Sequence, residues 1–300
     1  MSETLLYGLI LYDLIEGRQY IGGPAINIAL HMAFNKEKPT LVSCIGDDDL
    51  GKQAATLLRK HNVAMDFVNT SKTYATGTVP VFLDQHGNPT FEIIKPVAYD
   101  FIDLSDQQMQ KLTSKKFEIL YFGTVVQRSV TSATTLEKIL NSVSYSSVFF
   151  DINLRKGHFT KEVIEYSLNF TNIFKLNDSE LQWISKVFEL GTQDEQRIIN
   201  WVFRQFPVRI VLLTRGEKGA SVFTPDERTD IDGIKVEVKD TVGSGDAFSA
   251  GFIMEYTKSR NLLLAAQKGN ELGAYVAARS GAVPEIEENN TQRQGKEREL

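Results

Sequence analysis

The residues best suited to chemistry lie in the segment Asp240–Phe252, DTVGSGDAFSAGF. Gly243, Ser244 and Gly245 can turn the backbone sharply and aim several N–H groups at one point. The apolar run that follows predicts a buried helix beginning at about Gly245. Because the first N–H groups of a helix attract anions, this cradle could hold a transferring phosphoryl group while Asp246 takes a proton from an attacking hydroxyl. An N-cap aspartate in an ordinary glycine loop is an equally good interpretation of this string alone.

Two other segments could hold a polyhydroxyl substrate. The string GGPAIN (residues 22–27) opens a predicted helix, and Asn27 offers both a donor and an acceptor to a hydroxyl. Asp13 lies at the expected carboxyl end of the first strand, where open α/β sheets bind ligands. In DINLR (residues 151–155), Arg155 could grip a phosphate or a sugar with its planar fork. A plain turn and a surface salt bridge are the alternatives for these two strings.

Two later strand ends could border a nucleotide. In NDSE (residues 177–180), Asn177 and Glu180 could order the water molecules of Mg²⁺, while Asp178 and Ser179 are equally good helix caps. In TRGEKGA (residues 214–220), a hydroxyl and two glycines could approach a nucleotide or simply form a hairpin turn. No P-loop, G-x-G-x-x-G after the first strand, or zinc-binding pattern is present, which argues against those classes of enzyme.

The elements that must position these residues alternate between short β-type runs and amphipathic helical runs. This pattern predicts an α/β fold with a doubly wound, mostly parallel sheet. The expected strands are Leu5–Tyr12, Thr40–Cys44, Ile119–Phe122, Val148–Ile152, Asn172–Lys175 and Ile210–Thr214. The expected helices are Ala25–Phe34, Gly51–His61, Ser132–Val143, Asp178–Val187, Glu195–Phe206, Gly245–Thr257 and Leu262–Ala278.

One region departs from this alternation. The β-type runs Gly77–Leu83 and Thr90–Ile94 are joined by a strong turn signal and predict a hairpin, with which residues 14–21 could pair. A small β-sheet lid built from about 14–21 and 74–95 would cover a cleft, although an edge hairpin without a moving role is the alternative. Residues 287–300 are polar and without period, which predicts a frayed tail after a single domain of residues 1–286.

Bulk properties exclude several partners. The 300 residues carry a net charge of −5 with both signs interspersed, which does not favour nucleic acid or an anionic membrane as a partner. No apolar run approaches the ~20 residues of a membrane span. The single cysteine, Cys44, lies in an apolar run and predicts a buried thiol in a reducing compartment. With no secretory pattern at the start, a cytoplasmic protein is expected.

Taken together and in this order, GGPAIN and DTVGSGDAF resemble the two signatures of the ribokinase-like (PfkB-type) family of ATP-dependent sugar kinases. The resemblance extends from about Leu5 to Ile286, and YFGTVVQRS, DINLR and KLNDSEL look most like bacterial fructokinases. It implies transfer of the γ-phosphate of ATP to a sugar hydroxyl, with fructose giving fructose 6-phosphate. Ribose or 2-keto-3-deoxygluconate as acceptor, and a non-catalytic sugar-binding protein on the same scaffold, are the alternatives.

The resemblance also implies roles for individual residues. Asp246 would be the catalytic base, above an anion hole formed by the N–H groups of Gly243, Ser244 and Gly245. The sugar would be bound by Asp13, Gly22, Gly23, Asn27 and Arg155. Mg²⁺ and the phosphates would be met by Asn177 and Glu180, and the nucleotide by Asn177, Thr214, Gly216, Gly219 and Asn270. A monovalent cation such as K⁺ would be held, mostly through carbonyls, by Asp240, Val242, Val276, Arg279 and Gly281. The lid would also serve a homodimer.

One position departs from the family pattern. Fructokinase-like members usually carry an acid in a G-E-x-L-x-D string on the opening strand, and here Leu9 stands at the place of that acid. Asp13 is retained. The departure bears on the sugar site, and so on the identity of the sugar, and it slightly favours the non-catalytic alternative.

Overall fold

A computed structural model describes residues 3–15, 17–83 and 89–284 of the chain. Its larger sheet is parallel from one edge as far as β11 and is completed by two antiparallel strands. In spatial order the strands are β13 (Arg228–Ile231), β12 (Ala220–Phe223), β11 (Ile210–Thr214), β10 (Ile173–Asn177), β9 (Ser144–Asp151), β8 (Lys116–Gly123), β1 (Thr4–Tyr7), β4 (Thr40–Gly46) and β5 (Val68–Ser71). The predicted doubly wound α/β sheet is therefore confirmed.

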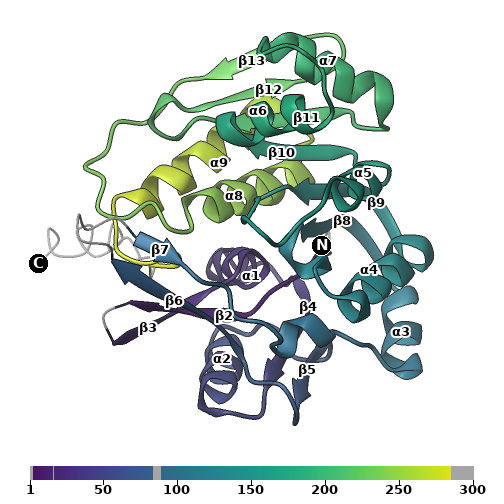
Figure 1. The fold of residues 1–300 in the computed structure, drawn as a ribbon, viewed down its shortest axis with the longest axis vertical. Coiled ribbons are helices and arrows are strands. Elements are labelled where there is room, and N and C mark those ends of the chain that lie inside the picture. The colour runs from purple at the N-terminus through teal and green to yellow at the C-terminus, as the bar shows by residue number, and fades with distance from the viewer. Residues whose placement is uncertain (1–2, 16, 84–88, 285–300) are drawn as a thin grey trace, which may run out of the picture.

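Helices cover both faces of this sheet, as Figure 1 shows. One face is covered by α1 (Pro24–Phe34), α2 (Asp49–Lys60), α8 (Ser244–Ser259) and α9 (Leu262–Ala277). The other is covered by α3 (Asp106–Thr113), α4 (Val130–Ser142), α5 (Lys161–Leu168), α6 (Asp178–Val187) and α7 (Glu195–Gln205). Within the described part of the chain, no helix is both long enough and apolar enough to cross a membrane.

Buried aromatic side chains tie the middle strands of the sheet together. Phe122, Phe150 and Phe174 come from β8, β9 and β10, and their stacked rings have centroids 5.1 and 5.8 Å apart. All three are fully buried. Because each such ring removes a large apolar area from water, the packing of these rings stabilises the central strands, whose ends position the polar residues. Cys44, in β4, is likewise buried, as expected, and burial raises the pKa of its thiol to about 11.

The first expected strand, Leu5–Tyr12, is two strands in different sheets, so that prediction was wrong. β1 ends at Tyr7, and β2 (Leu11–Ile15) belongs to the smaller sheet. The break falls at Gly8, where a Cβ would lie 2.8 Å from the Cβ of Ala25 in α1. The chain passes close to α1 here and then leaves the main sheet. Asp13 therefore lies in the smaller sheet and not at the end of a main-sheet strand.

The smaller sheet has the order β3 (Arg18–Gly22), β2, β6 (Gly77–Leu83) and β7 (Pro89–Phe91). β6 and β7 pair antiparallel, as the hairpin prediction required, and β2 pairs in parallel with β6. Figure 1 shows this sheet beside α1. The turn at 84–88 and the expected tail at 287–300 lie outside the described residues, and movement of the sheet as a lid stays a prediction.

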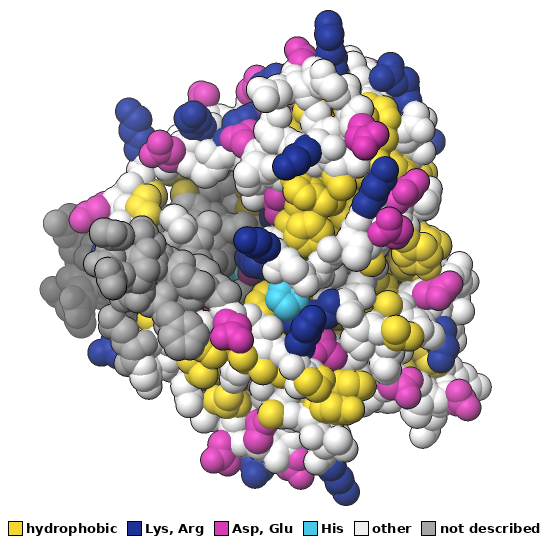
Figure 2. All heavy atoms as spheres, viewed as in Figure 1, with side chains coloured by type: hydrophobic (Ala, Val, Ile, Leu, Met, Phe, Trp, Pro, Cys, Tyr) yellow, Lys and Arg dark blue, Asp and Glu magenta, His cyan; other side chains and the backbone are white. Residues whose placement is uncertain are grey.

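Short elements were missed. The helices α3 and α5 and the strands β5 and β13 were absent from the expectation, because each has eight residues or fewer and a weak apolar period. On the face seen in Figure 2, basic and acidic side chains alternate over the surface. That mixture agrees with the small net charge.

Candidate active site

A cavity of about 610 Å³ opens at the carboxyl ends of the central strands. Tyr7 of β1 and Gly123 of β8 line its floor, and the first turns of α1 and α8 form one wall. The smaller sheet contributes Asp13 and Val79 from above. From β1 the strand order runs through β4 to one edge and through β8 to the other, and the crevice at such a switch point is where open α/β sheets bind ligands.

Asp246 and Asn27 meet inside this cavity. Asp246 lies in the first turn of α8, and its Oδ2 accepts a hydrogen bond of 2.7 Å from Nδ2 of Asn27 in α1. Burial raises the pKa of Asp246 to about 6; the Asn27 contact opposes this rise, and the carboxylate of Asp151 adds to it. Asn27 Oδ1 is buried and has no partner among the described residues. It is therefore available to accept from a substrate hydroxyl, next to a carboxyl group that can take a proton near neutral pH.

The start of α8 is set by a crowded glycine. Gly243 is the N-cap with φ 77°, and a Cβ on it would lie 2.4 Å from the Cβ of Ala282. The N–H of Ser244 donates to Thr241 O at 3.2 Å, so one of the three N–H groups expected in the anion hole has an acceptor within the loop. The N–H groups of Gly245 and Asp246 lie in the first turn, where a helix offers no intrahelical acceptor.

A buried cluster of polar side chains lies beneath this first turn. Asp151 Oδ2 accepts from Lys175 Nζ at 2.7 Å, from Ser249 Oγ at 3.2 Å and from the Tyr121 hydroxyl at 3.5 Å. A Cβ on Gly245 would lie 3.4 Å from Lys175 Nζ, so the ammonium sits directly against the start of α8. Burial lowers the pKa of Lys175, but Asp151 and Asp246 outweigh that effect and raise it overall. We call Tyr121, Asp151, Lys175 and Ser249 the Asp151 cluster.

Sequence reasoning missed Lys175. It assigned no role to the lysine that follows Ile173 and Phe174 at the end of the strand expected at 172–175, and that position was the available signal. Asp151 pairs in register with Lys175 in the sheet, which sequence alone does not reveal.

The N-x-x-E element forms a capping box at the start of α6. Asn177 Oδ1 accepts from the Glu180 N–H at 3.0 Å, and Glu180 Oε2 accepts from the Asn177 N–H at 2.9 Å. Glu180 Oε1 also accepts from Leu154 N–H, which fixes the loop after β9. Burial and the Asp151 charge raise the pKa of Glu180. Asn177 is therefore the N-cap, where Asp178 or Ser179 had been considered, and both motif residues line the cavity.

The other expected sugar-binding residues line the same cavity. A Cβ on Gly22 would lie 2.8 Å from Asp13 Oδ2, so the glycine leaves room for that carboxylate. Burial raises the pKa of Asp13 to about 6, against the opposing charge of Arg155. Gly23 has φ 110°, and a Cβ on it would lie 2.5 Å from the carbonyl oxygen of Leu9. All of these residues line the cavity, and Leu9 adds an apolar surface where an acid was expected.

Comparison with known proteins gives the family. Residues 12–289 match the pfkB family carbohydrate kinases. The chain belongs to this family. It is 25% identical to an ATP-dependent 6-phosphofructokinase of Thermoanaerobacterium thermosaccharolyticum, over 96% of this chain and 92% of that protein. It is 23% identical to the probable fructokinase-6, chloroplastic, of Arabidopsis thaliana, over 93% and 75%.

Among solved structures, a fructokinase from Vibrio cholerae O395 with bound fructose, ADP and calcium ion superimposes with a TM-score of 0.80. The two chains are 26% identical, over 94% of this chain and 95% of that one. The family and this likeness together establish a carbohydrate kinase with a ribokinase-like fold.

Of the residues expected to border the nucleotide, Asn177 and Thr214 line the cavity, whereas Gly216, Gly219 and Asn270 are not among its lining residues. Thr214 lines the cavity and donates weakly to Leu176 O at 3.4 Å. Gly219 has φ 89° in the β11–β12 hairpin, and a Cβ there would lie 2.0 Å from Ile231 O. Asn270 Nδ2 donates to Asp232 O at 2.8 Å. Gly219 and Asn270 thus have structural roles, and their contact with a nucleotide, like that of Gly216, stays a prediction.

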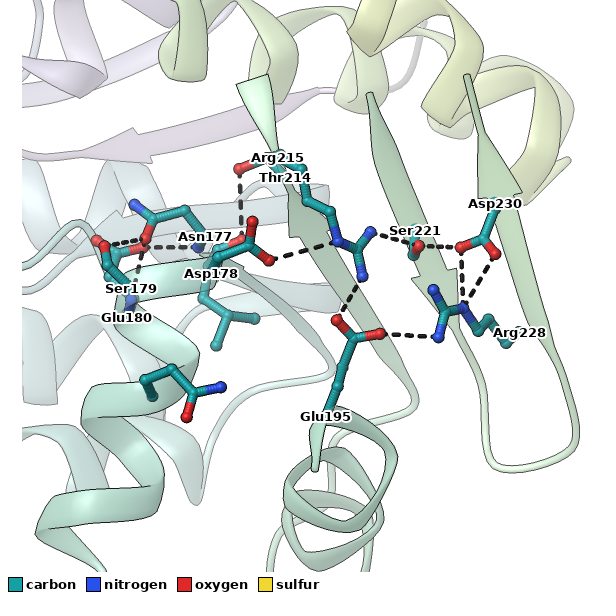
Figure 3. A network of polar contacts seen from close by, with 12 residues as sticks. Asn177, Asp178, Ser179, Glu180, Glu195, Thr214, Arg215, Ser221, Arg228 and Asp230 are labelled. Carbon is teal, nitrogen blue, oxygen red and sulfur yellow. Dashed lines mark hydrogen bonds and ion pairs between the residues drawn. The ribbon is translucent and has the colours of Figure 1, made fainter. Parts of the chain in front are cut away.

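A charged network braces this edge of the cavity (Figure 3). Arg215, which follows Thr214, lies 2.6 Å from Glu195 at the start of α7 and 3.4 Å from Asp178 at the start of α6. Glu195 also pairs with Arg228 of β13 at 2.8 Å. The guanidinium of Arg215 therefore fixes the end of β11 relative to two helix starts.

The two loops expected to hold a monovalent cation are joined by Asp240. Its Oδ1 accepts from Val242 N–H at 2.9 Å, and its Oδ2 accepts from Gly281 N–H at 3.1 Å. The Arg279 N–H donates to the carbonyl of Val276, which lies in the last turn of α9. In the described part of the chain, no group of three or more His, Cys, Asp or Glu side chains is placed to hold a metal ion. Carbonyl groups of these loops therefore remain the candidates.

Proposed function

We propose that this carbohydrate kinase transfers the γ-phosphate of ATP to a hydroxyl of a neutral sugar, with fructose as the acceptor and fructose 6-phosphate as the product. The Asn27–Asp246 pair in the cavity carries the proposal, because it places a free acceptor atom beside a carboxyl group whose pKa is about 6. Likeness to the fructokinase of Vibrio cholerae supports fructose in particular.

The charges that line the cavity favour a neutral acceptor over a sugar acid such as 2-keto-3-deoxygluconate. Arg128, one of two arginines that could meet an acid, is paired with Asp100 at 2.7 Å and also donates to Ile94 O. Arg155 is therefore the arginine that could still meet the carboxylate of a sugar acid. It is exposed, lines the cavity, and its charge acts on Asp13. The described acids that line the cavity are Asp13, Asp151, Glu180 and Asp246, and the cations are Lys175 and Arg155.

In the proposed mechanism, Asp13 and Asn27 orient the sugar, and Asn27 Oδ1 accepts from one of its hydroxyl groups. Asp246 takes the proton of the attacking hydroxyl as the bond to phosphorus forms. The N–H groups of the first turn of α8 face the phosphoryl oxygens, where charge accumulates. Closure of the smaller sheet over the cavity would exclude water and limit hydrolysis of ATP.

We infer that Mg²⁺ accompanies the nucleotide and that K⁺ binds between the loops around Asp240 and Gly281. Because acids outnumber cations along the cavity, a polyanionic nucleotide needs additional positive charge there. Mg²⁺ supplies charge neutralisation of the phosphates when it is bound, and Asn177 and Glu180 suit its water molecules. The lid sheet would also pair with a second copy in a homodimer, because β3 and β7 are its edge strands among the described residues and edge strands can pair with another chain.

The test is ADP formation from MgATP with fructose, ribose, glucose, mannose, tagatose and 2-keto-3-deoxygluconate, in the presence of K⁺. We expect fructose to give the strongest signal and Asp246→Asn to lower it about 10²–10⁴-fold, while sugar binding by calorimetry persists. A different preferred sugar would overturn the choice of fructose alone. Tight sugar binding by the wild type without any ADP formation would instead support a binding protein on the kinase scaffold.

A further inference from the structure

We propose that Lys175 is a catalytic residue whose ammonium group contacts the phosphoryl group during its transfer, and that Asp151 positions it. The inference rests on phosphoryl transfer by this chain and does not depend on which sugar is the acceptor.

The first support is the position of the ammonium. Lys175 extends from β10 towards α8 and lines the cavity, and its Nζ lies 3.4 Å from the place of a Cβ on Gly245. The first turn of α8 is where backbone N–H groups and the helix dipole attract an anion. A full positive charge therefore lies at the same point as the partial charges of the helix start, and next to the base Asp246.

The second support is the way in which the ammonium is held. Asp151 is its hydrogen-bond partner among the described residues, at 2.7 Å, and the two side chains are only 8% and 2% exposed. Ser249 Oγ donates to the same carboxylate oxygen from α8. Because an ammonium group has three N–H donors, this contact fixes its place and leaves two donors for a ligand.

The third support is energetic. A buried ion pair adds little stability compared with apolar side chains of similar size, because both charges lose their hydration. On the same face of β10, the preceding residue is Ile173, which packs in the apolar core. Because stability does not explain a lysine at position 175, its positive charge beside the cavity points to a role in binding or catalysis.

During transfer, the bond between the γ-phosphorus and the bridging oxygen of ATP breaks, and its electron pair leaves with ADP. A bond forms between that phosphorus and the sugar oxygen, whose proton passes to Asp246. Negative charge shifts among the phosphoryl and bridging oxygens while no new cation enters. A fixed ammonium that stabilises this charge more strongly in the transition state than in the bound substrate would raise kcat.

The test compares four proteins: wild type, Lys175→Met, Asp151→Asn and the double variant Asp151→Asn/Lys175→Met. The double variant removes both charges, so it leaves no unpaired buried carboxylate and avoids a simple loss of folding. For each protein, kcat, KM for MgATP, thermal unfolding and the binding of ADP with Mg²⁺ and aluminium fluoride are measured. The fluoride complex imitates the transferring phosphoryl group.

We expect Lys175→Met and the double variant to lose about 10²–10³-fold in kcat and to bind the fluoride complex more weakly, with little change in KM for MgATP. The double variant should unfold near the wild-type temperature. If the lysine only neutralises Asp151, the double variant will keep the wild-type kcat, and the inference is overturned. Should the wild type accept no sugar of the panel, the choice of acceptor fails, and the same comparison is made on transfer to water.

Discussion

Asn27 and Asp246, which are 219 residues apart in the chain, meet at 2.7 Å across the starts of α1 and α8. The contact joins the two glycine-containing strings of the sequence in one site. A carboxylate can only accept here, so the amide nitrogen of Asn27 must face Asp246, and its buried oxygen has no partner among the described residues. One side chain thereby adjusts the base and offers a group to the substrate.

Removal of this amide should shift the pH dependence of the reaction. Asp246 must be ionised to accept a proton, so activity falls as the pH drops through about 6. Because the Asn27 contact lowers the pKa of Asp246, Asn27→Ala should move this acidic limb upward by about one pH unit, the equivalent of one hydrogen bond to a charged group. The measurement is kcat/KM for the sugar against pH, because this ratio reports the pKa values of the free enzyme. In Asn27→Asp the limb should lie higher still, and a limb that stays in place in both variants would contradict the assignment.

The same shift has a consequence for stability. The folded-state pKa of Asp246 lies above its ordinary value, so its favourable contribution is complete below pH 4 and is lost as the pH rises through about 6. Above that pH the buried charge destabilises the fold by up to about 3 kcal/mol. Asp246→Asn should therefore unfold at a higher temperature than the wild type at pH 8 and at a similar temperature at pH 4.

Thermal unfolding at the two pH values checks this expectation. Asp226→Asn is the control, because Asp226 lies in an exposed turn and the same change of charge there should leave both temperatures unaltered. An Asp246→Asn protein that is less stable than the wild type at pH 8 would contradict the expectation. It would show that neighbouring groups stabilise the buried carboxylate by more than its loss of hydration costs.

Much of the main sheet could be predicted from the sequence, because parallel strands buried on both faces appear as short apolar runs. The prediction of one strand over residues 5–12 was wrong for the same reason, because the apolar run continues without interruption from β1 into the smaller sheet. Only the close approach of Gly8 to Ala25 marks the change. Asp13 nevertheless lies in the site, since the smaller sheet folds back over the cavity.

The arrangement of the candidate site was predictable where it depended on local sequence and hidden where it depended on strand register. The glycines of the string around Asp246 predicted the turn that starts α8, where Gly243 is the N-cap with φ 77°. Lys175 and Asp151 are 24 residues apart, and only their pairing on adjacent strands brings the two charges together. The ion pair of Arg128 with Asp100 is likewise not visible in the sequence, because the two residues lie on separate segments.

The Arg215 network should influence nucleotide binding more than sugar binding. Arg215 connects the hairpin after Thr214 to the starts of α6 and α7, so its loss frees that edge of the cavity. Arg215→Met should raise KM for MgATP several-fold and leave KM for the sugar within about twofold. Arg228→Met is the matched control, because Arg228 is at the outer end of the network and is 41% exposed, against 15% for Arg215. Equal effects of the two changes would argue against a positioning role.

Arg128 should govern stability and not the choice of substrate. Its guanidinium forms two hydrogen bonds with Asp100, and each side chain of the pair is 5% exposed. Arg128→Met leaves a buried carboxylate unpaired and should cost about 3–5 kcal/mol of unfolding free energy. Denaturant unfolding measures this cost, and Asp100→Asn/Arg128→Met should recover part of it. A selective loss of activity towards 2-keto-3-deoxygluconate in the double variant would instead place Arg128 in the sugar site.

Alanine substitutions at two glycines with similar φ angles separate the effect of backbone strain from the effect of steric crowding at the start of α8. Gly243 has φ 77° and Gly191 has φ 64°, so alanine is strained at either position and should cost roughly 1–2 kcal/mol. A Cβ at Gly191 meets nothing within 4 Å, whereas one at Gly243 would lie 2.4 Å from the Cβ and 2.5 Å from the Cα of Ala282. Gly243→Ala must therefore displace the first turn of α8.

Since a misplacement of about 1 Å near reacting atoms can cost 10²-fold, Gly243→Ala should lower kcat by about that factor. Gly191→Ala should lose a comparable part of its stability from strain and keep wild-type turnover. Both are measured by thermal unfolding and by ADP formation under the same conditions. Equal kcat values in the two variants would mean that the position of the α8 start does not limit transfer, and the anion hole would then have to be sought elsewhere along the cavity.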